Sequence, residues 1–230
     1  MTSKKTKKQP PKLNHIKKQT RPLTSKTKNK PPSPNRNKKF KKISAEAAEC
    51  TLCTRMAEEC AVLGDKNGSL QSRVVFVAEA PGRFGSGRTG IPFYGDKSGD
   101  NFQELIDHIK LSREEIFITN AVLCNPISEG VNSRPTAREV ANCSPFLKTV
   151  LDLIEPELVV TLGGVGLEAM NRLLGTRYKL NSDAAELIPI GSFQLLPLYH
   201  PSPRVANWRR PLVQQKQDFQ LILKALRLSA

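Results

Sequence analysis

The chain has 230 residues, which suits one ordinary domain with a tail, and it carries a net charge of +15 at pH 7. It contains no signal-peptide core and no apolar run long enough to cross a bilayer, which argues against secreted and membrane-spanning proteins. We therefore expect a soluble, intracellular protein without a membrane partner, either cytoplasmic or associated with the nucleoid.

The positive charge is concentrated at one end of the chain. Residues 1–42 hold 16 Lys and Arg and no Asp or Glu, whereas the remaining chain holds 20 basic and 21 acidic residues. This segment is rich in Lys, Pro, Asn and Thr and poor in large apolar residues, so it cannot bury enough surface to offset the entropy lost on folding. We predict a disordered basic tail over residues 1–42 and a folded domain over residues 43–230.

The composition of the tail indicates a polyanionic partner. A Lys-rich arm binds nucleic acid by releasing condensed counterions, without reading the base sequence. One alternative is a solvated tail that only keeps the protein soluble. An organelle-targeting segment is a weaker alternative, because Lys and Pro stand where Arg and an amphipathic pattern are expected.

The domain alternates predicted strands and helices. Capping-box patterns at Asp100 with Gln103 and at Thr136 with Glu139 mark two helix starts. The predicted strands cover 73–78, 116–123, 158–162 and 193–199, and the predicted helices cover 43–60, 101–110, 136–154, about 165–174 and about 211–227. This order predicts the α/β class: a three-layer αβα sandwich with a central, mostly parallel four-stranded sheet.

Polar side chains follow several of the predicted strands. Glu79 comes after the first strand, Asn120 stands at the end of the second, and His200 comes after the fourth. Ligands of such sheets bind beyond the carboxyl ends of the strands. The sequence therefore predicts that these three residues line one pocket.

Five cysteines suggest a metal centre rather than disulfides, because the count is odd and the chain is expected to be intracellular. Cys50 and Cys53 have Cys-x2-Cys spacing, and Cys124 and Cys143 flank a Pro-containing loop. Four thiolates suit zinc or a [4Fe–4S] cluster, whereas the alternative is that some are small buried apolar residues. Cys60 has no spacing partner, but it could replace one of the four.

Several motifs follow one another in a fixed order. After the Cys-x2-Cys pair come Ala-Glu-Ala-Pro-Gly at 78–82, Gly-Ile-Pro-Phe-Tyr-Gly-Asp at 90–96, Ile-Thr-Asn-Ala-Val-Leu-Cys at 118–124, Cys-Ser-Pro-Phe-Leu at 143–147 and Tyr-His-Pro-Ser-Pro at 199–203. In this order they resemble the iron–sulfur uracil-DNA glycosylases, which are families 4 and 5 of that superfamily. The resemblance covers about residues 45–225.

The resemblance is a hybrid of the two families. Glu79-Ala-Pro-Gly82 and Asn120 look like family 4, whereas Gly87-Arg-Thr-Gly90 and the string from Phe93 to Gly99 look like family 5. Family 5 usually has an apolar residue in place of Glu79 and lacks Asn120. Family 4 usually has a further acidic residue near Gly85 and a non-acidic one in place of Asp96. The resemblance therefore leaves two candidate catalytic carboxylates, Asp96 and Glu79, of which we favour Asp96.

The resemblance also implies a cofactor. In these families four cysteines hold a [4Fe–4S] cluster with a structural role, which favours iron over zinc at Cys50, Cys53, Cys124 and Cys143. It implies a substrate as well, because such an enzyme must extract a nucleotide from the DNA stack before it can read the base.

The predicted pocket then has a role for each side chain. Phe93 would stack on the base, and Asn120 would pair with uracil O4 and N3. His200 would donate to O2, where negative charge develops as the glycosidic bond breaks. Asp96 or Glu79 would orient the attacking water. The alternatives are a plain core Phe, a strand-end Asn, a loop His and two capping or turn-forming acids.

The remaining candidates would contact DNA. The backbone N–H groups of Ala80 and Gly82 could approach the base or a phosphate. In the run after His200, Ser202 could bind a phosphate, Arg204 could wedge into the vacated space, and Arg209 and Arg210 could bind the backbone. A solvated basic loop is the alternative for this run.

Together these features lead us to expect a monomeric hydrolase of base excision repair. It would hydrolyse the N-glycosidic bond of uracil in DNA after base flipping, and hypoxanthine or xanthine are alternative bases. The other alternative is a catalytically inactive iron–sulfur or zinc protein of the same fold that binds nucleic acid.

Overall fold

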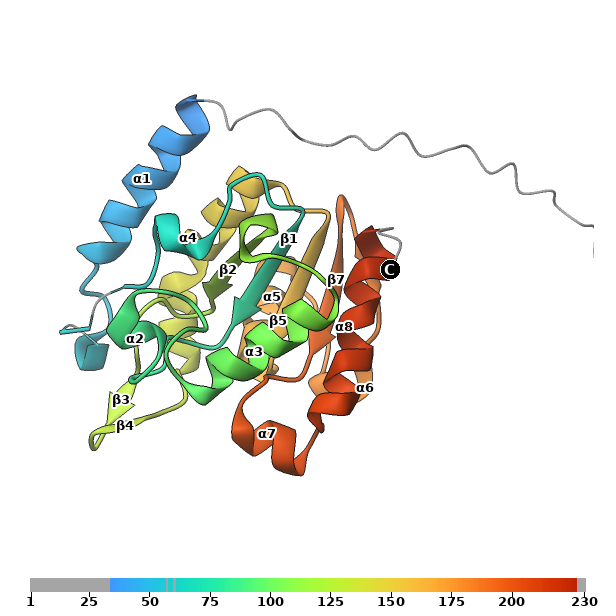
Figure 1. Ribbon diagram of the computed structural model, residues 1–230. Coiled ribbons are helices and arrows are strands. Elements are labelled where there is room, and N and C mark those ends of the chain that lie inside the picture. Colours follow the sequence, from blue (N-terminus) through green and yellow to red (C-terminus); the bar gives the residue numbers. More distant parts are fainter. Residues whose placement is uncertain (1–33, 57, 60, 227–230) are drawn as a thin grey trace, which may run out of the picture. The chain divides into compact units, whose positions relative to one another are not determined.

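The computed structural model describes residues 34–226, apart from residues 57 and 60. Its main sheet has the strand order β2-β1-β5-β7-β6 (Figure 1). The strands are β1 (Val74–Ala78), β2 (Ile116–Asn120), β5 (Leu158–Leu162), β6 (Ile188–Ile190) and β7 (Phe193–Leu198). All neighbouring pairs are parallel except β6 and β7, which confirms the predicted α/β class and the mostly parallel sheet.

The sheet contains one strand more than the four predicted. The additional strand, β6, is only three residues long and carries Pro189 at its centre. Proline cannot donate a ladder hydrogen bond, so such a strand is restricted to a sheet edge, where β6 lies. Its sequence therefore lacks the length and alternation that reveal a strand.

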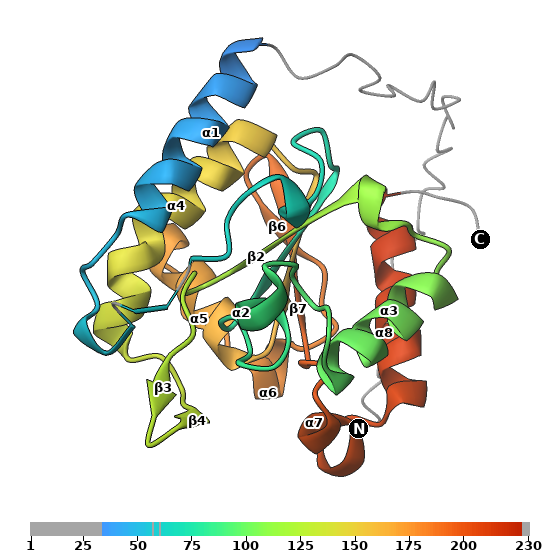
Figure 2. The same ribbon diagram turned by 60° about the vertical axis from the view of Figure 1, so that its left-hand side comes forward.

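Helices cover both faces of the sheet. Figure 2 shows α1 with α4 and α5 on one side and α3 with α8 on the other. The helices are α1 (Pro34–Ala48), α2 (Ser86–Thr89), α3 (Lys97–His108), α4 (Ala137–Ile154), α5 (Gly164–Leu174), α6 (Leu180–Asp183), α7 (Pro203–Trp208) and α8 (Leu212–Leu226). None of them, within the described residues, has the length and apolar composition needed to cross a bilayer.

Short elements complete the fold. A hairpin of β3 (Ile127–Ser128) and β4 (Val131–Asn132) precedes α4, and it projects at the same end of the molecule as α7 in both views (Figures 1 and 2). Single 3-10 turns cover Thr54–Met56, Asp65–Asn67 and Arg113–Glu115.

Burial explains why the strands read as continuous apolar runs. Every residue of β1, β2 and β5 is buried, because helices cover both faces of the sheet. One core lies toward α1, α4 and α5, and the other lies toward α3 and α8. The second core contains an aromatic cluster in which Phe76 packs edge-on against Phe102 and stacks on Phe219.

The first helix differs from the sequence prediction. Residues 34–42 were assigned to the disordered tail, but they form the first part of α1. Phe40 is only 3% exposed and packs edge-on against Phe117 of β2, with Ile43 and Ala47 buried along the same stripe. The Lys-rich composition concealed this apolar stripe of period three to four.

The predicted helix over 43–60 is correct only in its first third. The helix ends at Ala48, and a loop with one 3-10 turn carries Cys50 and Cys53. Residues 1–33 of the predicted tail lie outside the described residues.

The expected binding of the basic tail to nucleic acid predicts that deletion of residues 1–33 weakens DNA binding without lowering stability. The slope of log K against log [salt] should become less steep by about 0.9 for each duplex phosphate that the tail neutralises.

Deletion through residue 42 should in addition lower the free energy of unfolding by about 3 kcal/mol or more, since it removes the buried Phe40 ring. Binding titrations at several salt concentrations and urea unfolding measure both effects. An unchanged slope would rule out a direct phosphate role for the tail.

Candidate active site

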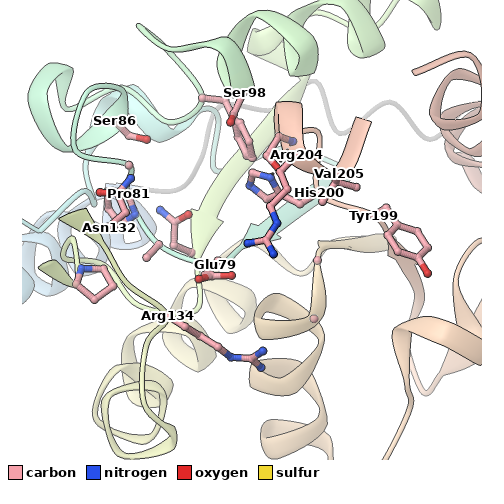
Figure 3. A pocket seen from close by; sticks show the side chains of 18 of the residues that line it. Glu79, Pro81, Ser86, Ser98, Asn132, Arg134, Tyr199, His200, Arg204 and Val205 are labelled. Atoms are coloured by element: carbon pink, nitrogen blue, oxygen red, sulfur yellow. Dashed lines mark hydrogen bonds between the residues drawn. The ribbon is translucent and has the colours of Figure 1, made fainter. Parts of the chain in front are cut away.

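A cavity of about 780 Å³ lies where the loops after β1, β2, β5 and β7 meet (Figure 3). Parallel pairing brings these loops together, because Ala78 is aligned with Asn120 and Leu162 with Leu198. The predicted site residues that line the cavity are Glu79, Ala80, Gly82, Phe93, Asp96, Asn120, His200, Ser202, Arg204 and Arg209. The expectation that Glu79, Asn120 and His200 share one pocket is thus met by the structure.

His200 is held in one neutral form. The backbone N–H of Ser202 donates to its Nδ1 atom at 3.1 Å, so Nδ1 carries no proton and Nε2 is the protonated nitrogen. Burial lowers the pKa of His200 to about 4, and the negative charge of Asp96 opposes this shift only partly. The imidazole therefore offers one N–H donor without a positive charge at neutral pH.

Asp96 has a structural contact and a face toward the cavity. It is the N-cap of α3, and its Oδ1 atom accepts a hydrogen bond from the Gly99 N–H at 2.9 Å. The other oxygen, Oδ2, lies against Gly82 and Gly85, where a Cβ atom would approach it to 3.1 and 2.3 Å. These two glycines therefore make room for the carboxylate beside the cavity.

Glu79 also lines the cavity, and Figure 3 shows it above Arg134. Burial raises the pKa of Glu79, and the positive charge of Arg134 counteracts the shift. Arg134 itself pairs with Glu168 of α5 at 3.0 Å. Within the described residues, Glu79 accepts no hydrogen bond, which leaves its oxygens available to a ligand or water.

Asn120 and Phe93 provide a polar edge and a flat face. Asn120 is 5% exposed, and no described residue accepts a hydrogen bond from its Nδ2 atom. A buried donor without a partner is costly, so this atom suits a ligand in the cavity. The Phe93 ring stacks on Phe102 with centroids 4.5 Å apart and lies 5.4 Å from the His200 ring.

The sequence prediction missed the cavity residues in the loop before α4, among them Asn125 and Asn132. Asn132 accepts a hydrogen bond from the Arg83 N–H at 3.1 Å. Asn125 is 1% exposed. Its amide is oriented so that Nδ2 points toward the Pro81 carbonyl oxygen and donates a hydrogen bond to it at 3.1 Å. Both side chains hold the turn that follows β1. Two Asn residues in a short Pro-containing loop were the available signal.

The predicted DNA-binding residues do not all reach the cavity. Arg204 and Arg209 line it, and Figure 3 shows Arg204 beside His200. Arg210 instead donates two hydrogen bonds to the buried Asp218, at 2.8 and 2.5 Å, and lies over the Tyr199 ring. Its guanidinium thus fastens α8 to the chain before it.

Four cysteines approach one another from three segments. Burial is the main cause that raises the pKa of Cys124 to about 12, and the thiols of Cys143, Cys50 and Cys53 contribute. Among the described residues, however, no three His, Cys, Asp or Glu side chains are arranged to hold a metal ion. Cys60 lies outside the described residues.

An arginine connects the cysteine loop to the cavity wall. Arg55 follows Cys53 and donates to both carboxylate oxygens of Glu139, at 2.6 and 2.7 Å. It also donates to the Ser133 hydroxyl and to the Arg134 carbonyl, both in residues that line the cavity. This ion pair lowers the pKa of Glu139 to about 2.

Comparison with known proteins identifies relatives of most of the folded part. Residues 66–227 match the model of the uracil DNA glycosylase superfamily. A type-4 uracil-DNA glycosylase of Thermotoga maritima is 31% identical over 167 residues, which are 72% of this chain and 82% of that protein. A type-5 uracil-DNA glycosylase of Pyrobaculum aerophilum is 32% identical over 160 residues, or 64% and 69% of the two chains.

The His200 imidazole should stay neutral through the physiological pH range. Since its pKa is lowered to about 4, against about 6.5 for an unperturbed histidine, it should not titrate between pH 8 and pH 5. Nitrogen-15 NMR should show a protonated Nε2 and an unprotonated Nδ1 over this whole pH range. The signals of His200 are those that disappear in His200→Gln. Nitrogen shifts that move through a midpoint near pH 6.5 would contradict this assignment.

Proposed function

Because the chain belongs to the uracil-DNA glycosylase superfamily, we propose that its cavity hydrolyses the N-glycosidic bond of uracil in DNA, as a repair glycosylase does. The observation that carries the proposal is the combination of a neutral His200 donor, an unpartnered Asn120 amide and the Phe93 ring in one cavity. The cavity is complete within one chain, which supports action as a monomer on DNA.

The substrate base would enter the cavity only after it leaves the DNA stack. Phe93 is 8% exposed and lines the cavity, so its ring would offer an apolar surface to the planar base. Asn120 offers both a donor and an acceptor, so its Nδ2 would donate to uracil O4 while its Oδ1 accepts from N3–H. Hydrogen bonding of the base would satisfy the buried Nδ2 atom that has no partner among the described residues.

Bond breakage places opposite charges on the two products. The electron pair of the C1′–N1 bond moves to uracil, and its negative charge spreads to O2. The Nε2–H of His200 would donate to O2 and stabilise this anion. A neutral imidazole suffices for this role, in agreement with the lowered pKa of His200.

The sugar needs a nucleophile and negative charge. Asp96 would orient a water molecule toward C1′ and offset the positive character of the sugar. The water oxygen bonds to C1′, and its proton passes first to the carboxylate and finally to the uracil anion. Glu79 would share the task or hold the water, since its carboxylate accepts no hydrogen bond from the described residues.

The DNA backbone would be held around the mouth of the cavity. Ser202, Arg204 and Arg209 line the cavity after β7, and the backbone of Ala80 and Gly82 lines it after β1. Ser202, Arg209 and the backbone N–H groups would bind phosphates, whereas Arg204 would fill the space that the base vacates. Arg210 would not bind a phosphate, because its guanidinium is bonded to Asp218.

We further propose that Cys50, Cys53, Cys124 and Cys143 hold a [4Fe–4S] cluster. The chemistry of the donor set fits, because four thiols from three segments lie near enough to influence one another. The cluster would cross-link these segments and supply no step of the hydrolysis. Zinc is the alternative ligand of the same thiolates.

Asp96→Asn should lower the single-turnover rate of uracil release by about 100-fold or more, because asparagine still caps α3 but cannot take a proton. Glu79→Gln should have a smaller effect. The assay uses single- and double-stranded oligonucleotides that contain uracil, hypoxanthine or xanthine, which also ranks the alternative bases.

Asp100→Asn is the matched control, since Asp100 is an exposed acid in the first turn of the same helix. It should leave the rate near that of the wild type. A wild-type protein that releases none of the three bases would exclude the glycosylase and favour the inactive binding protein of the same fold.

Purified protein should contain about four iron and four sulfide ions per chain. Cys124→Ser should lose most of this iron and unfold at a lower urea concentration, whereas Cys60→Ser should keep its iron. Elemental analysis and sulfide determination measure the content. Stoichiometric zinc in place of iron would refute the cluster, and iron loss in Cys60→Ser alone would replace one of the four proposed ligands.

A further inference from the structure

The backbone of Phe93 adopts an unfavourable conformation at the wall of the cavity. Its φ angle is +50°, in the left-handed region that bulky L-residues rarely occupy. Strain of this kind persists only where surrounding contacts impose it, and it is common at ligand sites. The contacts that impose this backbone conformation at Phe93 should therefore determine where its ring lies in the cavity wall.

Arg113 supplies those contacts from outside the cavity. Its Nη1 atom donates to the Pro92 carbonyl at 2.8 Å, and its Nη2 atom donates to the Phe93 carbonyl at 2.7 Å. Its Nε atom donates to Gln103 of α3 at 2.8 Å, which orients the guanidinium. One planar fork thus holds the carbonyls on both sides of the left-handed residue, as hydrogen bonds from a cation do most strongly.

The neighbouring helix allows this arrangement only because residue 99 is glycine. A Cβ atom at Gly99 would lie 2.6 Å from the Phe93 carbonyl oxygen, which is shorter than any normal contact. The Arg113 guanidinium also lies 5.7 Å from the centroid of the Phe102 ring, on which Phe93 stacks. Arg113 therefore holds both the backbone of Phe93 and the ring beneath it.

We infer that Arg113 is a positioning residue that sets the Phe93 ring as the stacking surface for the extruded base. This role rests on the proposed function, because it assigns the planar base of that reaction to the Phe93 face. Arg113 does not line the cavity, so its effect on the substrate passes through Phe93. Without the fork, the strained residue relaxes and the ring leaves its stacked position on Phe102.

Two kinds of variant separate positioning from general stability. Arg113→Met removes the donors but keeps a long side chain over Phe102, and Arg113→Lys keeps a cation that can reach a carbonyl without the fork. Arg73→Met is the matched control, since Arg73 also donates three side-chain hydrogen bonds, two to the Glu157 carboxylate and one to the Leu226 carbonyl, away from the cavity.

Crystal structures test the positioning itself, whether or not uracil is the substrate. In Arg113→Met, we expect Phe93 to leave the left-handed region and its ring to leave Phe102. In Arg73→Met we expect the wild-type conformation, and in Arg113→Lys we expect Phe93 to keep that conformation at partial occupancy, because lysine can hold one of the two carbonyls but not both. An Arg113→Met structure with Phe93 still at its present φ angle and stacked on Phe102 would overturn the inference.

A double-mutant cycle with Phe93→Ala tests the functional consequence. Arg113→Met should lower kcat/KM for uracil release about tenfold to hundredfold, with partial rescue in Arg113→Lys, and should leave binding of abasic product DNA unchanged, because that DNA has no base to stack. In the Phe93→Ala background, Arg113→Met should cause little further loss. Additive losses, or weaker binding of abasic DNA, would show that Arg113 acts by another route. A wild-type protein without activity would refute the proposed function alone, and the crystal structures would still decide the positioning.

Discussion

Parallel pairing of β1 with β2 and β5 is the constraint on which the rest of the molecule depends. It places the carboxyl ends of the strands at one edge, so residues 42 or 84 positions apart in the sequence become neighbours. The strands are buried on both faces, and helices must therefore cover them on both sides. Polar side chains can therefore reach a ligand only from the loops and from the ends of the strands and helices. The residues that line the cavity lie at these places.

Several residues at that edge make a structural contact with one atom and keep another atom available at the cavity. Asp96 caps α3 through Oδ1 while Oδ2 faces Gly82 and Gly85. His200 accepts the Ser202 N–H at Nδ1 and keeps its Nε2–H for a ligand. For Asp96 and His200, the sequence allowed a structural role or a catalytic role as alternatives. The structure shows that one side chain has atoms for both. A structural contact fixes one atom and so directs the other.

The sequence predicted those features that depend on local pattern. Buried strands of β-branched residues, the capped helix α4 and the pocket of Glu79, Asn120 and His200 follow from hydrophobic runs and from the general geometry of parallel sheets. The resemblance to known families supplied most individual roles. Arg210 shows the limit of this reasoning, since a basic residue in a basic loop is bonded to the buried Asp218, eight residues further along the chain.

Features that depend on tertiary contacts escaped prediction for a physical reason. The apolar stripe of α1 is sparse and becomes meaningful only when Phe40 meets Phe117. Asn125 and Asn132 are ordinary loop residues until the turn after β1 lies against them. Arg113 belongs to no recognisable motif, and only the left-handed backbone of Phe93 reveals what it does.

The Arg55–Glu139 pair joins two regions that the sequence keeps 84 residues apart. Since the pKa of Glu139 is lowered to about 2, below that of an unfolded glutamate, the pair stabilises the fold above about pH 4.3 and loses this effect only as the pH falls toward 2. The cysteine loop and the wall at Ser133 and Arg134 therefore stay joined under all physiological acidities. A displacement of the loop that carries Cys50 and Cys53 would therefore also displace the cavity wall.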